Sequence, residues 1–216
     1  MLPEKHTTYY DIIDSFKEKG CPICFLVDRS VNAFFKSFLM EFVLNHNLTQ
    51  KLNKSKGFCE RHGFSLIKHG DSLATAITYN VLMDDLLAEL KKTGAIKSSF
   101  FKKEGDCPAC EAFNESDERY TDAFVLYAKD EELIEKYKKS TGVCVPHLRK
   151  ILSKCKDKEL LKQLTDIHLD FYGKLNNELI SIIRKNDYRY SKEPWGNEKD
   201  AWIRAVEKFV GRQYKG

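Results

Sequence analysis

Apolar residues recur at helical spacing over most of this sequence. Phenylalanines and aliphatic residues fall three and four positions apart between about 25 and 44, and two longer segments that open at Asp71 and Asp157 show the same period. The stripes in these longer segments are Tyr79, Leu82, Met83, Leu86, Leu87 and Leu90, and then Leu164, Ile167, His168, Phe171, Leu175, Leu179 and Ile182. No segment alternates with the period of a strand. The pattern predicts an all-α fold with these stripes in the core.

Shorter helices and breaks are expected between the long ones. In the first half, the pattern predicts a break at 45–47, then a short helix capped by Thr49 and ended by Gly57. A similar helix in the second half is predicted to be capped by Asp130 and to end near Ser140, and Gly142 follows it. In both halves the glycine can adopt the left-handed turn that redirects the chain.

A last amphipathic helix is predicted near the end of the sequence. Trp202, Ala205, Val206 and Phe209 share one of its faces. We expect this face to dock on the rest of the protein.

Composition and charge narrow the classes of function. The 216 residues are 42% hydrophobic and 12% aromatic, which is typical of a folded domain. No apolar run could span a membrane and no signal peptide is visible, so a cytoplasmic protein is expected. The formal net charge of +4 comes from lysines interspersed with glutamates, which is typical of solvated helix faces. This pattern does not favour nucleic acid as a partner.

Seven cysteines in such a chain favour metal ligands or redox chemistry over a disulfide framework. Six of them form motifs. The first half contains Cys21-Pro-Ile-Cys24 and Cys59-Glu-Arg-His62, and the second contains Cys107-Pro-Ala-Cys110 and Cys144-Val-Pro-His147. Equivalent positions are separated by 86 or 85 residues, which indicates an internal duplication.

The duplication suggests a division of the chain. An N-terminal helix over 1–20 leads into a first repeat over 21–95, and a second repeat covers 96–186. Residues 187–216 form a linker and the docking helix. The two repeats are expected to pack as pseudo-equivalent helical units in a bundle-like domain.

Each repeat contains three cysteines and one histidine, a complete ligand set for a tetrahedral ion. We expect two structural zinc ions, with an iron–sulfur cluster as the alternative. Chain-length arithmetic permits each repeat to close its own site. The predicted ligand sets are therefore Cys21, Cys24, Cys59 and His62 for one ion, and Cys107, Cys110, Cys144 and His147 for the other.

The four blocks CPxC, GFCxxH, CPxC and GxCxPH, together with the segment from Glu193 to Gly211, resemble an uncharacterised prokaryotic family. The resemblance covers nearly the whole chain. It implies a domain of unknown function that binds metal, and it supplies no catalytic residues.

Other polar residues offer weaker signals. Cys155 aligns with His69, and both are expected to lie too far along their helices to be further ligands. His168 is expected to be a hydrogen-bonded core residue. Asp84 and Asp170 occupy equivalent positions, either as solvated carboxylates or, with His168, as the lining of a groove between the repeats.

No catalytic set is recognisable, so enzymatic activity stays open and is not favoured. The function that the sequence favours is a zinc-stabilised helical scaffold that binds another protein or a small ligand in a groove between the repeats. The alternative is a redox or sensing protein that uses iron–sulfur clusters or Cys-x-x-Cys thiols.

Overall fold

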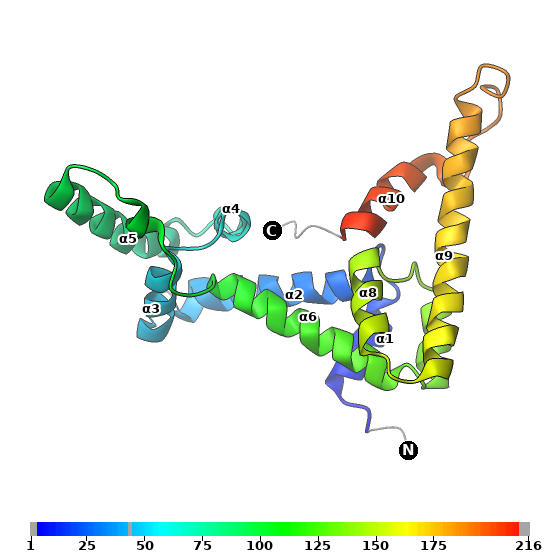
Figure 1. Ribbon diagram of the computed structural model, residues 1–216, viewed down its shortest axis with the longest axis horizontal. Coiled ribbons are helices and arrows are strands. Elements are labelled where there is room, and N and C mark those ends of the chain that lie inside the picture. The colour runs from blue at the N-terminus through cyan, green and yellow to red at the C-terminus, as the bar shows by residue number, and fades with distance from the viewer. Residues whose placement is uncertain (1–3, 43–44, 212–216) are drawn as a thin grey trace. The chain divides into compact units, whose positions relative to one another are not determined.

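The computed structural model describes residues 4–42 and 45–211, which form α-helices with short 3-10 and π segments and contain no β-strand (Figure 1). The predicted all-α fold is confirmed. No helix in this part of the chain combines the length and the hydropathy needed to cross a bilayer.

The described chain divides into two compact units. Unit 1 contains residues 4–27 and 117–211, and unit 2 contains the residues between them. Two helices, α2 (Pro22–Ser37) and α6 (Pro108–Tyr127), begin in one unit and end in the other. Each unit therefore draws on both halves of the sequence. The internal repeat itself stays a prediction from the sequence.

Unit 1 is built mainly from the C-terminal half of the chain. Besides parts of α2 and α6, it contains α1 (Thr7–Ser15), α7 (Glu131–Lys138), α8 (Val145–Lys154), α9 (Lys158–Lys185), the 3-10 helix η3 (Asn197–Asp200) and α10 (Ala201–Val210). Its core is aromatic: the Phe124 and Tyr137 rings lie 4.9 Å apart, and both side chains are fully buried.

Helix α1 is tied to the start of α7 by a buried tyrosine. The Tyr9 hydroxyl donates to Oδ1 of Asp130 at 2.8 Å, and the same carboxylate accepts from the Leu133 amide at 3.0 Å. Asp130 therefore caps α7, as predicted, and also joins two helices that are distant in sequence.

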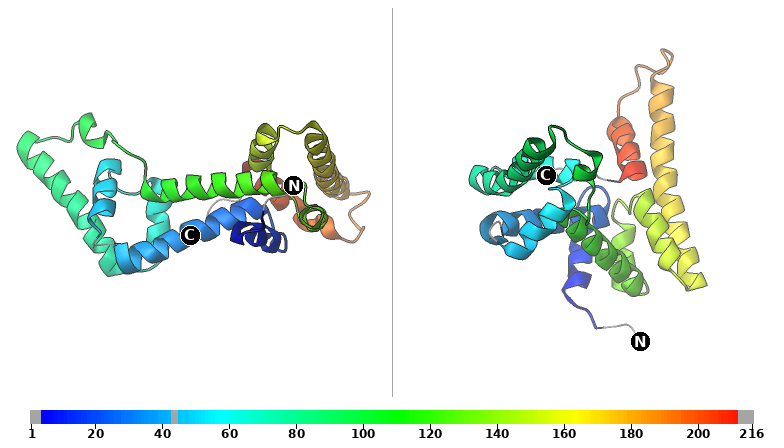
Figure 2. Two further views of the ribbon diagram at one scale, coloured as in Figure 1. Left: turned by 90° about the horizontal axis from the view of Figure 1, so that it is seen from below. Right: turned by 60° about the vertical axis from the view of Figure 1, so that its left-hand side comes forward.

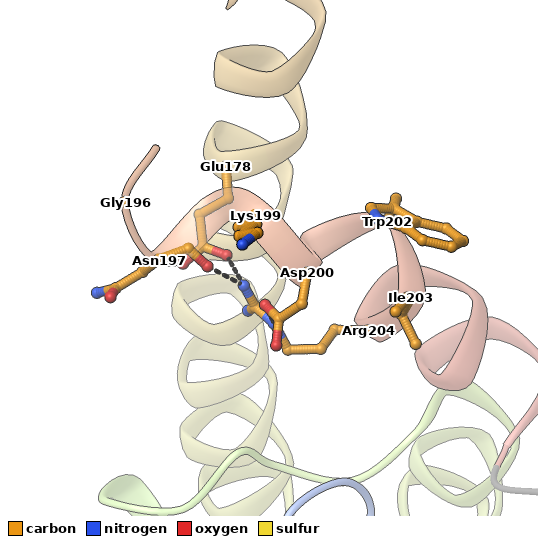
Figure 3. A pocket seen from close by; sticks show the side chains of 8 residues that line it. All are labelled: Glu178, Gly196, Asn197, Lys199, Asp200, Trp202, Ile203 and Arg204. Atoms are coloured by element: carbon orange, nitrogen blue, oxygen red, sulfur yellow. Dashed lines mark hydrogen bonds and ion pairs between the residues drawn. The ribbon is translucent and has the colours of Figure 1, made fainter. Parts of the chain in front are cut away.

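Helix α10 packs against α9 and α8 (Figures 1 and 2). Arg204 anchors it through Glu178 of α9 and, at 2.7 Å, the Asn197 carbonyl (Figure 3). The predicted docking face is wrong, because Trp202 is 60% exposed and Phe209 73%. Instead, the helix packs through the side that carries Arg204, because the ion pair with Glu178 and the hydrogen bond to the Asn197 carbonyl hold that side in place.

Unit 2 contains the rest of α2, the π-helix η1 (Phe38–Phe42), α3 (His46–Ser55), α4 (Glu60–Lys68), α5 (Ser72–Thr93) and the 3-10 helix η2 (Ser98–Phe101) (Figure 2). Its core is a phenylalanine cluster. The Phe58 ring lies 5.3 Å from Phe38 and 5.5 Å from Phe35, and all three side chains are buried.

The predicted helix ends are confirmed with one exception. Asp71 caps α5, Asp157 caps α9, and Gly57 and Gly142 have φ of +87° and +71°. Helix α3, however, begins at His46 and is capped by Asn45, whose side chain accepts from two backbone amides. Thr49 was the wrong cap because the N-cap already lies four residues earlier, so Thr49 lies in the first turn of the helix and its hydroxyl donates to the Asn45 carbonyl at 3.0 Å.

The predicted core stripe of α5 is wrong for part of its length. Met83 is 53% exposed and Leu87 is 44% exposed, while Ala74 is the one α5 residue classed as buried. Adjacent apolar pairs such as Leu82 and Met83 point to different sides of a helix, so they cannot all face one core. The predicted stripe of α9 is confirmed: Leu164 and His168 are buried, and the other members are half-buried, namely Ile167, Phe171, Leu175, Leu179 and Ile182.

Candidate metal centres

Four helix N-termini carry the residues of the four motifs. Cys59 and Cys144 are the N-caps of α4 and α8, and His62 and His147 follow in the first turns. Cys21 and Cys107 directly precede Pro22 and Pro108, the first residues of α2 and α6. The peptide dipoles at a helix N-terminus stabilise negative charge, which favours thiolates at all these positions.

In unit 1, Cys21, Cys24, Cys144 and His147 form one group, which we call site 1. Their ligand atoms all lie within 4.8 Å of one another, and all four residues are buried. Nδ1 of His147 lies 3.1 Å from the Cys144 sulfur, 3.3 Å from Cys21 and 3.4 Å from Cys24. The Cys24 and Cys144 sulfurs are 3.8 Å apart.

In unit 2, Cys59, His62, Cys107 and Cys110 form a second group, site 2, within the same 4.8 Å limit. Nδ1 of His62 lies 3.3 Å from the sulfurs of Cys59 and Cys110 and 3.6 Å from that of Cys107. The Cys59 and Cys110 sulfurs are 3.6 Å apart. Cys59 and Cys110 are only half-buried, unlike any residue of site 1.

The structure brings all eight predicted residues into two groups but overturns their predicted pairing. The first Cys-x-x-Cys lies with the second Cys-x-x-His, and the second Cys-x-x-Cys with the first Cys-x-x-His. The reason is the length of the intervening helices. Helix α2 extends about 24 Å from Cys21, and α6 about 30 Å from Cys107, so each carries the next motif into the other unit.

The spacing of the ligand atoms fits one tetrahedral ion at each site. With Zn–S bonds of about 2.3 Å and Zn–N bonds of about 2.0 Å, neighbouring sulfurs should lie about 3.8 Å apart and a sulfur and a nitrogen about 3.5 Å apart. The observed separations, 3.6 and 3.8 Å for sulfur pairs and 3.1–3.6 Å for sulfur and nitrogen, match. They are too long for a disulfide, whose sulfurs are about 2.05 Å apart. The two sites could therefore each hold a metal ion.

Asp117 supports site 1 from behind His147, and the sequence did not reveal it. Its Oδ1 lies 2.5 Å from Nε2 of His147, so the ring donates to the carboxylate from its outer nitrogen and turns Nδ1 toward the sulfurs. Lys150 also forms an ion pair with this buried carboxylate. A carboxylate behind a histidine is a common support for a metal ligand because it fixes the tautomer and orientation of the ring.

The crowding of ionisable groups shifts their pKa values in opposite directions. Burial opposes protonation of His147, but hydrogen bonds with Asp117, Cys144 and Cys21 outweigh it and raise its pKa to about 12. Burial, together with the charge of Arg61, instead lowers the pKa of His62 to about 4. Burial and the neighbouring thiols raise the pKa of Cys110 to about 12. A bound dication would displace the protons of the cysteine thiols and the histidine imidazoles at both sites, because these ligands bind metal in their deprotonated forms.

The loop that precedes Cys144 is held from two sides. The Tyr137 hydroxyl accepts from the Val143 amide at 3.0 Å and lies 2.7 Å from Nε2 of His168, whose Nδ1 lies 2.6 Å from the Leu164 carbonyl. Lys208 of α10 donates to the carbonyls of residues 141 and 142. His168 is therefore a hydrogen-bonded core residue, as predicted, and part of the support of site 1.

The remaining candidate residues lie outside both sites. Cys155 donates to the Asp157 carbonyl, and the His69 ring packs 5.2 Å from Phe35. Asp84 accepts from Asn80, and Asp170 forms an ion pair with Lys174 one turn along its helix. Each of these two exposed carboxylates thus bonds to a side chain of its own helix.

Residues 5–215 match the model of a family described as a family of unknown function (DUF6062), and the chain belongs to this family. An uncharacterised 23.9 kDa protein encoded in the xynA 3′ region of Caldicellulosiruptor sp. (strain Rt8B.4) is 31% identical over 208 residues, which cover 94% of this chain and all of that protein. No solved structure matches the chain. The predicted membership of an uncharacterised family is confirmed, and the comparisons assign no activity.

Proposed function

We propose that this protein is a helical scaffold stabilised by two structural zinc ions, one at site 1 and one at site 2. The observation that carries the proposal is the pair of four-residue groups with ligand atoms within 4.8 Å of one another. Each group already supplies the four ligands of a tetrahedral zinc ion. A catalytic zinc site would supply three and leave one position for water or substrate.

The donor atoms favour zinc among the common metals. Three thiolates and one imidazole suit zinc, whereas calcium and magnesium prefer oxygen ligands. An iron–sulfur cluster distributes its ligands over several irons and so needs sulfurs farther apart than the ligands of one ion. The close grouping supports a single ion at each site. A reducing compartment such as the cytoplasm would keep these thiols available for metal.

The topology supports a structural role. Site 1 joins Cys21 to Cys144, which is 123 residues later, and site 2 joins Cys59 to Cys107, which is 48 residues later. Structural zinc contributes on the order of 10 kcal/mol in small peptides, comparable to the total stability of a domain. Two ions would therefore hold together segments that no disulfide links.

A scaffold of this kind acts by binding rather than by chemistry. We propose another protein or a small ligand as the partner, because the four-ligand sites leave no vacant position for a substrate. The groove between the repeats, suggested by the sequence as the binding place, stays a prediction. A redox role is the second candidate and is favoured by the half-buried thiols of site 2.

Metal analysis of the purified protein, together with three cysteine variants, tests the proposal. We expect two zinc ions and no iron or sulfide in the wild type, and one zinc in Cys59→Ser or Cys144→Ser, each with a melting temperature lower by many degrees. Cys155→Ser is the matched control, because this cysteine lies outside both sites, and it should keep two zinc ions. Iron with sulfide, or a reversible disulfide without zinc, would favour the redox candidate.

A further inference from the structure

We infer that the two sites exchange metal at different rates, with site 1 exchanging slowly and site 2 open to exchange with zinc-binding ligands from solution. The inference rests on the proposed zinc sites and goes further by assigning them different roles. Site 1 would have a structural role and stabilise unit 1. Site 2 would load and release zinc according to its supply, and so report metal availability through the state of unit 2.

The cysteines of site 1 are buried by the surrounding protein. Cys21, Cys24 and Cys144 are 4%, 7% and 0% exposed. The backbone after α10 lies directly against the site: a β-carbon at Gly211 would lie 3.6 Å from the Cys144 sulfur and 3.7 Å from that of Cys24. An incoming ligand would have to displace this segment before it could reach either sulfur.

Lys208 holds α10, and with it the Gly211 segment that covers site 1, in place. Its ammonium donates to the Thr141 carbonyl at 2.5 Å and to the Gly142 carbonyl at 2.6 Å, in the loop that leads to Cys144. The same residue lies three positions before Gly211 on the last turn of α10. Helix α10 is therefore hydrogen-bonded to the loop that leads to Cys144 of site 1.

Site 2 is more accessible. Its Cys59 and Cys110 sulfurs belong to half-buried residues, although Cys107 and His62 are buried. Zinc leaves a thiolate site most readily when a second ligand can attack the ion before the first one departs. The half-buried Cys59 and Cys110 offer that approach, whereas all four residues of site 1 are buried.

Unit 2 also has the structural means to respond to its metal. Helix α5, which packs against α4, leaves much of its apolar surface uncovered. Segments with little buried apolar surface open more easily than a well-packed core. Loss of zinc from site 2 would therefore loosen unit 2 and leave site 1 with its metal.

The test measures thiol protection one cysteine at a time. The zinc-loaded protein is mixed with EDTA and N-ethylmaleimide, quenched at intervals, and analysed by peptide mass spectrometry. Cys155 reacts independently of either site and serves as the internal reference. We expect Cys59, Cys107 and Cys110 to be modified at least tenfold faster than Cys21, Cys24 and Cys144. Equal rates, or faster modification of the site 1 cysteines, would overturn the inference.

A variant of the cover sharpens the test. Lys208→Met should accelerate modification of Cys24 and Cys144 several-fold, whereas Lys199→Met, which changes an exposed lysine of η3, should not. An unchanged rate in Lys208→Met would contradict the role of α10 as the cover. If the zinc sites themselves are wrong, the outcome differs, because no zinc would be found and EDTA would not change the modification rate of any of the six cysteines.

Discussion

Oδ1 of Asp117 lies 2.5 Å from Nε2 of His147, on the side of the ring opposite the three sulfurs of site 1. Burial opposes the charge of this carboxylate, but the hydrogen bonds from His147 and Lys150 outweigh it and lower the pKa of Asp117. The aspartate is therefore ionised at neutral pH and can hold the histidine in the orientation that presents Nδ1 to a metal.

We predict that Asp117→Asn weakens zinc binding at site 1 by about 10- to 100-fold, the usual effect of removing such a support. The asparagine can still accept a hydrogen bond, but it lacks the negative charge. Competition with a chromophoric chelator measures the affinity. Asp122→Asn removes another carboxylate of α6, one that pairs with Lys154, and should bind zinc like the wild type. Equal affinities in the two variants would contradict the prediction.

The crossed pairing of the motifs predicts which thiols lose protection together. In zinc-loaded Cys144→Ser, Cys21 and Cys24 should become reactive toward N-ethylmaleimide, while Cys107 and Cys110 stay protected. Pairing within each half of the sequence predicts the reverse, because Cys144 would then share its ion with Cys107 and Cys110. Peptide mass spectrometry after brief labelling without chelator distinguishes the two arrangements.

Gly142 should tolerate no side chain. Its φ is +71°, and a β-carbon there would lie 2.5 Å from Cδ2 of Phe171. We expect Gly142→Ala to lower the free energy of unfolding by about 3 kcal/mol, from left-handed strain and from overpacking together. Gly70→Ala is the control: its φ is +78° with open space around it, so only the strain of about 1 kcal/mol applies. Urea unfolding of the two variants should show this difference, and equal losses would exclude the clash with Phe171.

Much of the site was predictable because its chemistry is local. The motifs that contain Cys59 and Cys144 place ligands at helix N-termini, and the glycines at 57 and 142 adopt the left-handed turns that their position after a helix predicts. Spacing along the chain is enough to recognise such features.

The features that the sequence did not reveal depend on where a helix ends in space. The distance from Cys24 to Cys59 permits a return to the same site, but it does not show that α2 instead carries the chain into the other unit. Asp117 lies ten residues after Cys107 in a helix rich in acidic residues, and nothing local distinguishes it from Glu115 or Glu118. The face of α10 was misassigned for a related reason, since periodicity identifies an apolar face without showing what covers it.

His168 should make the protein less stable in mild acid. Its ring is buried between the Tyr137 hydroxyl and the Leu164 carbonyl, and burial lowers its pKa below the ordinary value of about 6.5. The carbonyl can only accept, so Nδ1 carries the proton and Nε2 accepts from Tyr137. Protonation of Nε2 would leave the Tyr137 proton without this acceptor.

Because the folded-state pKa is lower than the unfolded one, the unfolded chain binds the proton first as the pH falls. The stability linked to His168 is therefore complete above pH of about 6.5 and is lost below it, by at most about 1.4 kcal/mol per pH unit. Urea unfolding of the wild type and of His168→Gln at several pH values between 7.5 and 5 isolates this contribution, since loss of zinc in acid affects both proteins. The wild type should lose stability more steeply than the variant, and parallel losses would show that His168 does not titrate in this way.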